Sequence, residues 1–254
     1  MKSDLQLCVL SFDGFSELWP VFFDHYFQQF PDSKYKINLI TNYKIYSDKR
    51  VNSLQVGDDI SWSSNLIKSL EKIDSERILF LYDDVFFTKF DPQYLDRMLG
   101  LAKQKNYEWL TLRPSNFAVG SEELGIRKIA KNATYRASLF LSIVKRDIML
   151  DLLLAKESAW QFEIFGTKRS LNFDFWAVKH NRIEYMHGII KGVWCYPVYQ
   201  ILKNNYQFKQ LVHKEKFRLY LLRLIKEKLY YCYYHCLPMW MIVKIDKVRL
   251  KKYG

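Results

Sequence analysis

The stretch from residue 76 to residue 92 places the strongest constraint on the fold of this 254-residue chain. Residues 78–82 form a continuous apolar run, which is typical of a strand buried on both faces. Two adjacent carboxylates, Asp83 and Asp84, end the run. Because an unpaired carboxylate costs several kcal/mol to bury, we expect the pair at the carboxyl edge of a sheet, where open α/β sheets bind their ligands. Acids that simply face water at the end of a strand would give the same local pattern.

The segments around this strand alternate between strand-like and helix-like patterns. Residues 5–11 and 36–42 are apolar enough for buried strands, and residues 15–30 repeat large apolar side chains every four positions, as a helix does. Ser61 or Ser63 is suited to cap a helix that leads into the acidic strand. Further helices are expected at 94–102 and 145–155, further strands at 109–112, 135–144 and 183–186, and irregular chain at 115–133. This alternation predicts an α/β fold with a mixed, mostly parallel sheet flanked by helices.

The positive charge gathers at the C-terminal end of the chain. Residues 203–254 hold 13 Lys or Arg against 3 Asp or Glu, which accounts for +10 of the net charge of +12. Residues 214–236 have a helical pattern that Pro238 ends. We therefore divide the chain into a main domain, 1–202, and a basic, aromatic, helical tail, 203–254. The tail is expected either to bind an anionic membrane surface or nucleic acid, or to pack on the main domain with a solvated basic face.

Tyr and Trp decide between the two kinds of partner for the tail. Their rings suit the headgroup region of a bilayer, so the anionic membrane surface is favoured and nucleic acid is disfavoured. No apolar stretch reaches the roughly 20 residues of a transmembrane helix, and no signal peptide is visible. The four cysteines lack zinc-site spacing and are expected to be free thiols in a reducing compartment. These features indicate a cytoplasmic protein that is peripheral on the inner face of the membrane.

Five sequence segments carry a resemblance to a known family. They are LSFDG at 10–14, LITN at 39–42, SWS at 61–63, LFLYDDVFF at 79–87 and ESAWQFE at 157–163. In this order they resemble the GT-A glycosyltransferases of bacterial surface-polysaccharide biosynthesis, which make capsule, O-antigen and lipooligosaccharide. The resemblance spans roughly residues 5–200 and leaves the tail uncovered. It implies a GT-A-like, Rossmann-like fold with a nucleotide-sugar-binding and catalytic domain.

The resemblance also implies a nucleotide-sugar donor, with a UDP-sugar most expected, and a divalent metal such as Mn²⁺ or Mg²⁺. In this family an Asp-x-Asp motif holds the metal, and Asp83 and Asp84 occupy its place. The sequence departs from the pattern because these acids are adjacent. Either one carboxylate suffices, or the enzyme works without metal. A late His completes the metal shell in similar enzymes, which points to His187, although an ordinary surface residue would fit equally well.

Asp83 and Asp84 are also expected to contact the ribose or diphosphate of the nucleotide, and three further residues are candidates for contacts with it. In similar enzymes the loop after the first strand meets the nucleobase or ribose, so Asp13 is expected there, unless it only stabilises the turn before Gly14.

Gly188 and Gly192 suggest that the backbone near His187 and Lys191 approaches a ligand closely. Lys191 would neutralise phosphate as a point charge, unless it is an ordinary surface residue at the end of a strand. Arg169, in a basic loop, is the weaker phosphate candidate.

The acceptor side is expected in the segment 157–163. Inversion at a sugar carbon requires a base that removes the proton of the acceptor hydroxyl. Glu163 is the leading candidate and Glu157 its competitor, and either would also serve as a helix cap. Trp160 would stack on the face of the acceptor sugar.

These observations predict a glycosyltransferase, inverting, that transfers a sugar from a nucleotide-sugar to a glycan or lipid-linked precursor of a bacterial surface polysaccharide. The alternative is a non-catalytic basic protein that binds membrane or nucleic acid through its tail. Stabilisation by a nucleoside diphosphate would favour the first, and a salt-dependent response to polyanions the second.

Overall fold

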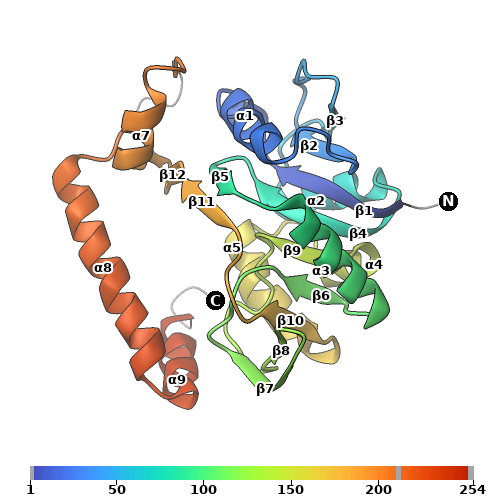
Figure 1. Ribbon diagram of the computed structural model, residues 1–254, viewed down its shortest axis with the longest axis vertical. Coiled ribbons are helices and arrows are strands. Elements are labelled where there is room, and N and C mark those ends of the chain that lie inside the picture. Colours follow the sequence, from blue (N-terminus) through green and yellow to red (C-terminus); the bar gives the residue numbers. More distant parts are fainter. Residues whose placement is uncertain (1–2, 210–212, 251–254) are drawn as a thin grey trace.

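A nine-stranded sheet lies at the centre of the computed structural model, which describes residues 3–209 and 213–250 (Figure 1). In chain order its strands are β1 (Ser3–Leu10), β2 (Ile37–Thr41), β3 (Val51–Gln55), β4 (Ser75–Tyr82), β6 (Trp109–Thr111), β7 (Ala118–Glu123), β8 (Ile126–Ile129), β9 (Ser142–Lys145) and β10 (Phe175–Val178). Across the sheet the order is β3-β2-β1-β4-β9-β6-β10-β8-β7. Only β9 and β8 run against the others in this sheet, so it is mixed and mostly parallel, as predicted.

The strand β4 carries apolar side chains on both of its faces. Leu79 and Leu81 belong to one hydrophobic core, and Ile78 and Phe80 belong to the other. All four side chains are fully buried. Burial of side chains of this size stabilises a fold by about 1.5–3 kcal/mol each. The prediction of a strand buried on both faces is confirmed.

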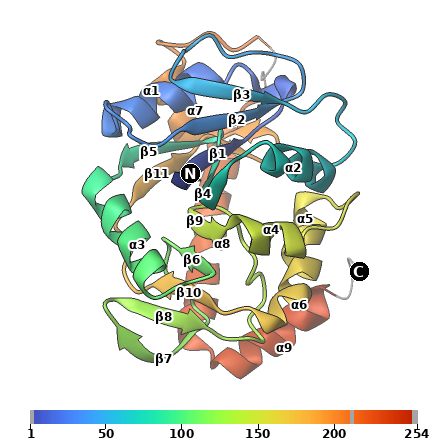
Figure 2. The same cartoon turned by 90° about the vertical axis from the view of Figure 1, so that its right-hand side faces the viewer.

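Helices cover both faces of the sheet. Their bounds are α1 (Trp19–Gln29), α2 (Trp62–Glu71), α3 (Pro92–Gln104), α4 (Arg146–Leu152), α5 (Ala159–Gln161), α6 (Thr167–Arg169), α7 (Tyr196–Leu202), α8 (Phe217–Cys236) and α9 (Met239–Leu250). The helices α1 and α3 lie on one side and α2 and α4 on the other (Figure 2). The Ser61 side chain accepts a hydrogen bond from the backbone N–H of Ser64, so Ser61 and not Ser63 caps α2.

Two further small ladders lie beside the main sheet. β5 (Val85–Lys89) begins directly after Asp84 and pairs with β11 (Glu184–His187). β12 (Ile189–Ile190) and β13 (Val193–Trp194) form a hairpin. β5 is not predicted from the sequence, because two adjacent acids are typical of the end of a strand. The chain instead turns sharply at the acids and continues as a strand.

The expectations for residues 115–144 were wrong in two places. Residues 115–133 contain the hairpin of β7 and β8, which turns at Leu124 and Gly125. Both have positive φ, as a two-residue hairpin turn that matches the strand twist requires. The expected strand at 135–144 is limited to β9, since Leu141 has a φ of 55° that interrupts an extended chain.

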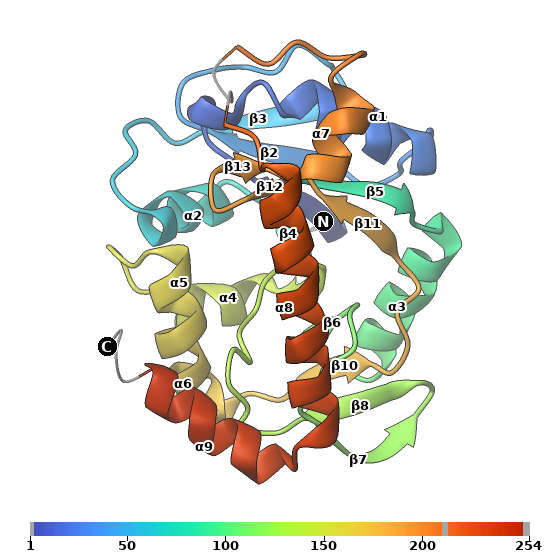
Figure 3. The same cartoon turned by 90° about the vertical axis from the view of Figure 1, so that its left-hand side faces the viewer.

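The helix α8 stands away from the rest of the molecule between two anchored ends (Figures 1 and 3). At its start Arg223 bonds to both carboxylate oxygens of Glu215 at 2.8 and 3.0 Å. Beyond its end, α9 places Ile242 and Val243 in a hydrophobic core. Among the described residues no helix combines the length and apolar character needed to cross a bilayer. Lys251 and Lys252 of the basic tail lie outside the described residues.

Candidate functional site

A cavity of about 790 Å³ opens at the carboxyl ends of β1 and β4. Its lining is drawn from residues 10–15, 59–66, 82–84 and 159–163, together with Ile40 and Lys191. Every one of the segments that carry the family resemblance therefore contributes to a single site. The carboxyl ends of β1 and β4 point toward α8 in Figure 1, and α8 runs across this end of the molecule in Figure 3.

The carboxylate of Asp83 is buried at the base of this cavity. The hydroxyl of Ser11, at the end of β1, donates a hydrogen bond to Oδ2 of Asp83. Nε1 of Trp19 donates to the same hydroxyl oxygen at 2.7 Å. Burial raises the pKa of Asp83 well above its ordinary value, and the negative charge of Asp84 raises it further. The chain thus holds a poorly solvated acid in a fixed position, as expected for a group that binds a cation or accepts a hydrogen bond from a ligand.

Asp84 lies beside Asp83 and is less deeply buried. Burial raises the pKa of Asp84 to about 6. Its carbonyl oxygen accepts a hydrogen bond from the N–H of Gly188 at 2.7 Å. A Cβ on Gly188 would lie 2.5 Å from the Phe86 ring and 3.1 Å from the Asp84 carbonyl oxygen. The sequence predicted that the backbone at the glycines near His187 approaches a ligand closely. In the structure, Gly188 instead approaches Phe86 and Asp84 of the same chain.

The two acids fit one side of a divalent metal site. Carboxylate oxygens suit Mn²⁺ and Mg²⁺, and no Lys or Arg in the described part of the chain is paired with either of these buried acids. Within residues 3–209 and 213–250 no three His, Cys, Asp or Glu side chains gather closely enough to hold a metal. His187 lies at the end of β11 and outside the cavity lining. A metal ion here would depend on oxygens of a diphosphate and of water to complete its shell.

Glu163 reaches the cavity from a π-helical turn. The segment Phe162–Gly166 is π-helical between α5 and α6, and such turns occur often at functional sites. Burial raises the pKa of Glu163, whereas a hydrogen bond with Ser138 and the charge of Arg113 lower it. Trp160, in α5, lines the same cavity, and its ring lies 5.5 Å from that of Tyr135. The predicted base and the predicted stacking residue thus face one space.

Lys191 is carried to the cavity by the hairpin of β12 and β13. Its φ of 53° and the φ of 75° at Gly192 form the two-residue turn that such a hairpin requires. The side chain is exposed at this turn. Lys191 is therefore available to approach an anion in the cavity.

Asp13 lies near the cavity but is occupied by the neighbouring loop. Its carboxylate accepts hydrogen bonds from the backbone N–H groups of Asn42, Tyr43 and Lys44 at 2.9, 3.0 and 3.1 Å. These bonds tie the loop after β1 to the loop after β2. Asp13 is outside the cavity lining, and this arrangement gives it a structural task in place of the predicted nucleobase contact.

Glu157 and Arg169 bind each other instead of facing the cavity. Two nitrogens of the Arg169 guanidinium donate to the two carboxylate oxygens of Glu157 at 2.8 and 2.6 Å. Neither residue lines the cavity. The pair fixes the loop before α5, and the backbone N–H of Glu157 donates to Ser63 Oγ at 2.8 Å. The structure therefore brings Asp83, Asp84, Trp160, Glu163 and Lys191 together and leaves the other candidates outside.

Several lining residues were not singled out from the sequence. Phe12 has an exposed ring that lies 4.7 Å from the Phe15 ring. Asn65 donates from Nδ2 to Asp59 at 2.7 Å, while its Oδ1 is buried and has no hydrogen-bond partner among the described residues. Trp62 lies 5.4 Å from Phe162, ring to ring. Phe12 and Trp62 stand inside the segments that carried the resemblance, so that signal was present. Asn65 had none beyond its position in the first turns of α2.

Comparison with solved structures supports the fold, whereas comparisons of the sequence gave no match. No protein-family model and no curated protein matches the chain. Among solved structures, S. aureus TarS 1–349 matches with a TM-score of 0.51 and 10% identity over 72% of this chain and 59% of TarS. Its complex with UDP-GlcNAc matches with a TM-score of 0.50 and 11% identity over 83% of this chain and 68% of TarS. The match spans about three fifths to two thirds of the TarS chain. It establishes a GT-A-like fold, which confirms the predicted fold class.

Proposed function

We propose that this chain is a glycosyltransferase that moves a sugar from a nucleotide-sugar to an acceptor hydroxyl, with inversion at the anomeric carbon. One observation carries the proposal. Segments far apart in the sequence meet at the carboxyl edge of a GT-A-like sheet, where Asp83, Asp84, Trp160, Glu163 and Lys191 line one cavity. Ligand sites of open α/β sheets lie at this edge.

A UDP-sugar is the donor that this cavity suits best. The exposed Phe12 ring offers a surface on which a base stacks. The buried Oδ1 of Asn65 needs a donor, and uracil presents an N–H at the ring position where cytosine presents an acceptor. The complex of the structural neighbour TarS with UDP-GlcNAc agrees with this choice of donor. The diphosphate would meet Lys191 and the two acids through a divalent ion.

The proposed reaction uses Glu163 as the general base. Glu163 takes the proton of the acceptor hydroxyl while that oxygen bonds to the anomeric carbon, and UDP leaves with the electrons of the broken carbon–oxygen bond. Its raised pKa favours this role, because a base is most effective when its pKa approaches the working pH. Mn²⁺ or Mg²⁺ held by Asp84 and Asp83 would stabilise the departing diphosphate. Lys191 adds a positive charge at the same cavity.

The acceptor that we propose is a lipid-linked or glycan precursor of a bacterial surface polysaccharide. Trp160 is exposed at the cavity, where a sugar ring would stack on it. A lipid-linked acceptor remains at a membrane surface, so the enzyme must work there. The tail, residues 203–254, is the part of the chain that we assign to this task.

The exposed apolar residues of α8 support membrane contact. Leu222, Ile225 and Leu229 are 56, 56 and 66% exposed on a helix that also carries Arg218 and Lys228. The helix crosses the end of the molecule onto which the cavity opens (Figure 3). An anionic leaflet attracts each such cation by about 1 kcal/mol and would accept the apolar side chains. We therefore propose that the protein is peripheral on the cytoplasmic face of the membrane, with the cavity facing the lipid.

A thermal-shift panel tests the proposed activity against the alternative of a non-catalytic basic protein. UDP with Mn²⁺ should raise the melting temperature more than GDP, CDP or CMP, because only UDP combines the diphosphate with uracil. A basic binding protein would ignore the nucleotides and respond to heparin or anionic vesicles in a salt-dependent way. Asp32→Asn, on an exposed turn without a hydrogen bond in the described structure, is the control for loss of a charge.

A further inference from the structure

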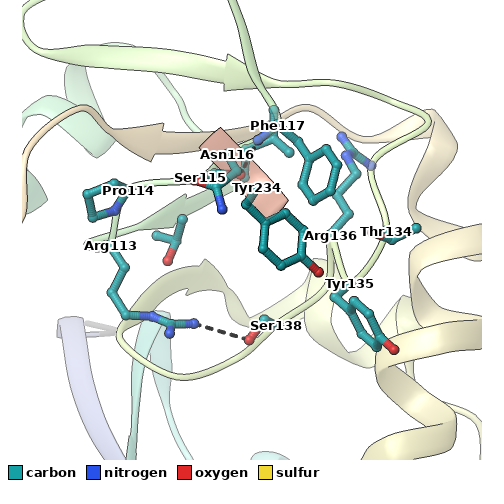
Figure 4. A pocket seen from close by; sticks show the side chains of 12 residues that line it. Arg113, Pro114, Ser115, Asn116, Phe117, Thr134, Tyr135, Arg136, Ser138 and Tyr234 are labelled. Atoms are coloured by element: carbon teal, nitrogen blue, oxygen red, sulfur yellow. Dashed lines mark hydrogen bonds between the residues drawn. The ribbon is translucent and has the colours of Figure 1, made fainter. Parts of the chain in front are cut away.

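A second cavity has a volume of about 230 Å³, and its lining is drawn in Figure 4. Its lining includes Thr111, Arg113, Asn116, Thr134, Ser138 and Tyr234. Two contacts form the wall between the cavities. Ser138, on the second cavity, bonds to Glu163, on the first. Tyr135 and Trp160 are in ring contact across the same boundary. A molecule whose hydroxyl reaches Glu163 would thus lie directly beside the second cavity.

The guanidinium of Arg113 lies at this wall, and few of its hydrogen-bond donors have a partner in the described structure. Its Nη2 donates to Ser138 Oγ at 3.3 Å, and the dashed line in Figure 4 marks this bond. Its Nε is buried without a hydrogen-bond partner among the described residues. No carboxylate in the described part of the chain forms a salt bridge with Arg113. A guanidinium has five N–H donors arranged to match an oxyanion, so most of this capacity is unfilled.

A second guanidinium adds to the positive charge of the lining. Arg136 is buried, and its terminal nitrogens donate to the carbonyl oxygens of Ser170 and Phe173 at 2.6 Å each. It has no salt bridge within the described residues. Two acids of the described chain lie at the cavity: Asp246 of α9 accepts from Thr134 at 3.0 Å and from Tyr234 at 3.5 Å, and Glu163 bonds to Ser138 at the shared wall. Of the two guanidiniums in the lining, Arg113 is therefore the one whose donors remain largely unused in the described structure.

We propose that the second cavity binds an oxyanion of the acceptor, a phosphate or a carboxylate close to the hydroxyl that Glu163 deprotonates. Arg113 is the main contact, and the side-chain amide of Asn116 offers a second hydrogen-bond donor in the same lining. Because Tyr234 belongs to α8, the tail completes the wall of this subsite. The assignment of the oxyanion to an acceptor rests on the proposed function, whereas oxyanion binding itself does not.

Amide chemical-shift mapping of the whole protein tests the subsite directly. Phenyl phosphate and methyl glucuronide are the probes, and phenol and methyl glucoside are their neutral controls. The charged probes should move the amides of Asn116, Ser138 and Tyr135, and the neutral ones should not. Stronger binding of phenyl phosphate would indicate a phosphate-bearing acceptor, and stronger binding of methyl glucuronide an acidic sugar.

Variants at Arg113 give the second measurement. Arg113→Gln should weaken the charged probes by about tenfold or more, as loss of a charged hydrogen-bond partner does, and Arg113→Lys should retain part of the affinity. Arg97→Gln removes an exposed guanidinium from α3, outside both cavities, and should change nothing. Shifts confined to residues 10–15, 59–66 and 82–84, or equal binding by Arg113→Gln, would refute the subsite. Oxyanion binding in a protein that ignores UDP would uphold the subsite and refute the proposed function.

Discussion

The hydroxyl of Ser11 donates a hydrogen bond to the buried carboxylate of Asp83, 72 residues further along the chain. This bond joins the carboxyl ends of the two adjacent parallel strands β1 and β4. It also holds in place an acid whose burial raises its pKa. The loop after β1 and the acidic turn after β4 therefore form one unit at the base of the cavity.

Ser11→Ala should destabilise the protein by about 1–3 kcal/mol, the range for a lost hydrogen bond to a charged or buried group. Trp19 loses its acceptor in the same variant, which adds to the effect. Urea unfolding at neutral pH measures the change. Ser47→Ala, at an exposed position, should stay within about 0.5 kcal/mol of the wild type. Equal stability of the two variants would show that the bond to Asp83 contributes nothing.

Asp84→Asn should stabilise the metal-free protein at pH 8 and have little effect at pH 4. The folded pKa of Asp84 is about 6, whereas the ordinary value is 3.8, so the folded state binds the proton more tightly than the unfolded state. The contribution of Asp84 is most favourable below about pH 4, and it is lost as the pH rises to about 6. The shift of roughly two pKa units corresponds to about 3 kcal/mol. Unfolding in EDTA at both pH values measures it, and a variant less stable than the wild type at pH 8 would contradict the account.

Glu163→Gln should lower the rate of sugar transfer by about 10²–10⁴-fold while leaving donor affinity unchanged. Because burial raises the pKa of Glu163, wild-type activity should fall as the pH drops through that raised value, and the residual activity of the variant should lack this step. Glu157→Gln is the matched comparison. It breaks the pair with Arg169 and should reduce stability more than chemistry. Loss of activity in Glu157→Gln alone would move the role of base to Glu157.

Leu222→Glu combined with Leu229→Glu should weaken binding to vesicles containing phosphatidylglycerol by about tenfold or more. Both side chains are exposed on α8, so the change removes apolar contact and adds negative charge without opening a core. The control is Ile45→Glu with Leu154→Glu, two equally exposed apolar positions in the main domain. Sedimentation with vesicles measures both variants. Membrane binding by the α8 variant that equals that of the control would refute the role of the tail.

The sequence predicted the features that depend on residues close to one another in the chain. The apolar run before Asp83 and Asp84 predicted β4 and its carboxyl end, because a strand with four consecutive apolar residues must be covered on both of its faces. The resemblance predicted that Trp160 and Glu163 would share a site with these acids. In the structure these two residues and the two acids line one cavity.

The roles that depend on distant partners could not be predicted. Asp13 is occupied by backbone groups about 30 residues away, and no local pattern distinguishes this from a free acid. Glu157 and Arg169 are 12 residues apart and pair only because α5, the π-helical turn and α6 run on as one helical segment. Arg113 lies just after the short strand β6. Its proposed role depends on its contacts with Ser138 and Glu163, which belong to other segments of the chain.

Calorimetric titration with UDP tests the central claim most directly, namely that the cavity beside Asp83 and Asp84 binds a nucleotide donor. In the presence of Mn²⁺, the wild type and Asp32→Asn should bind UDP with equal affinity, more tightly than CDP. Asp84→Asn should lose at least about tenfold in affinity, because it removes a charged ligand of the metal–diphosphate unit. Absence of UDP binding by the wild type, or the same affinity in Asp84→Asn, would contradict the account.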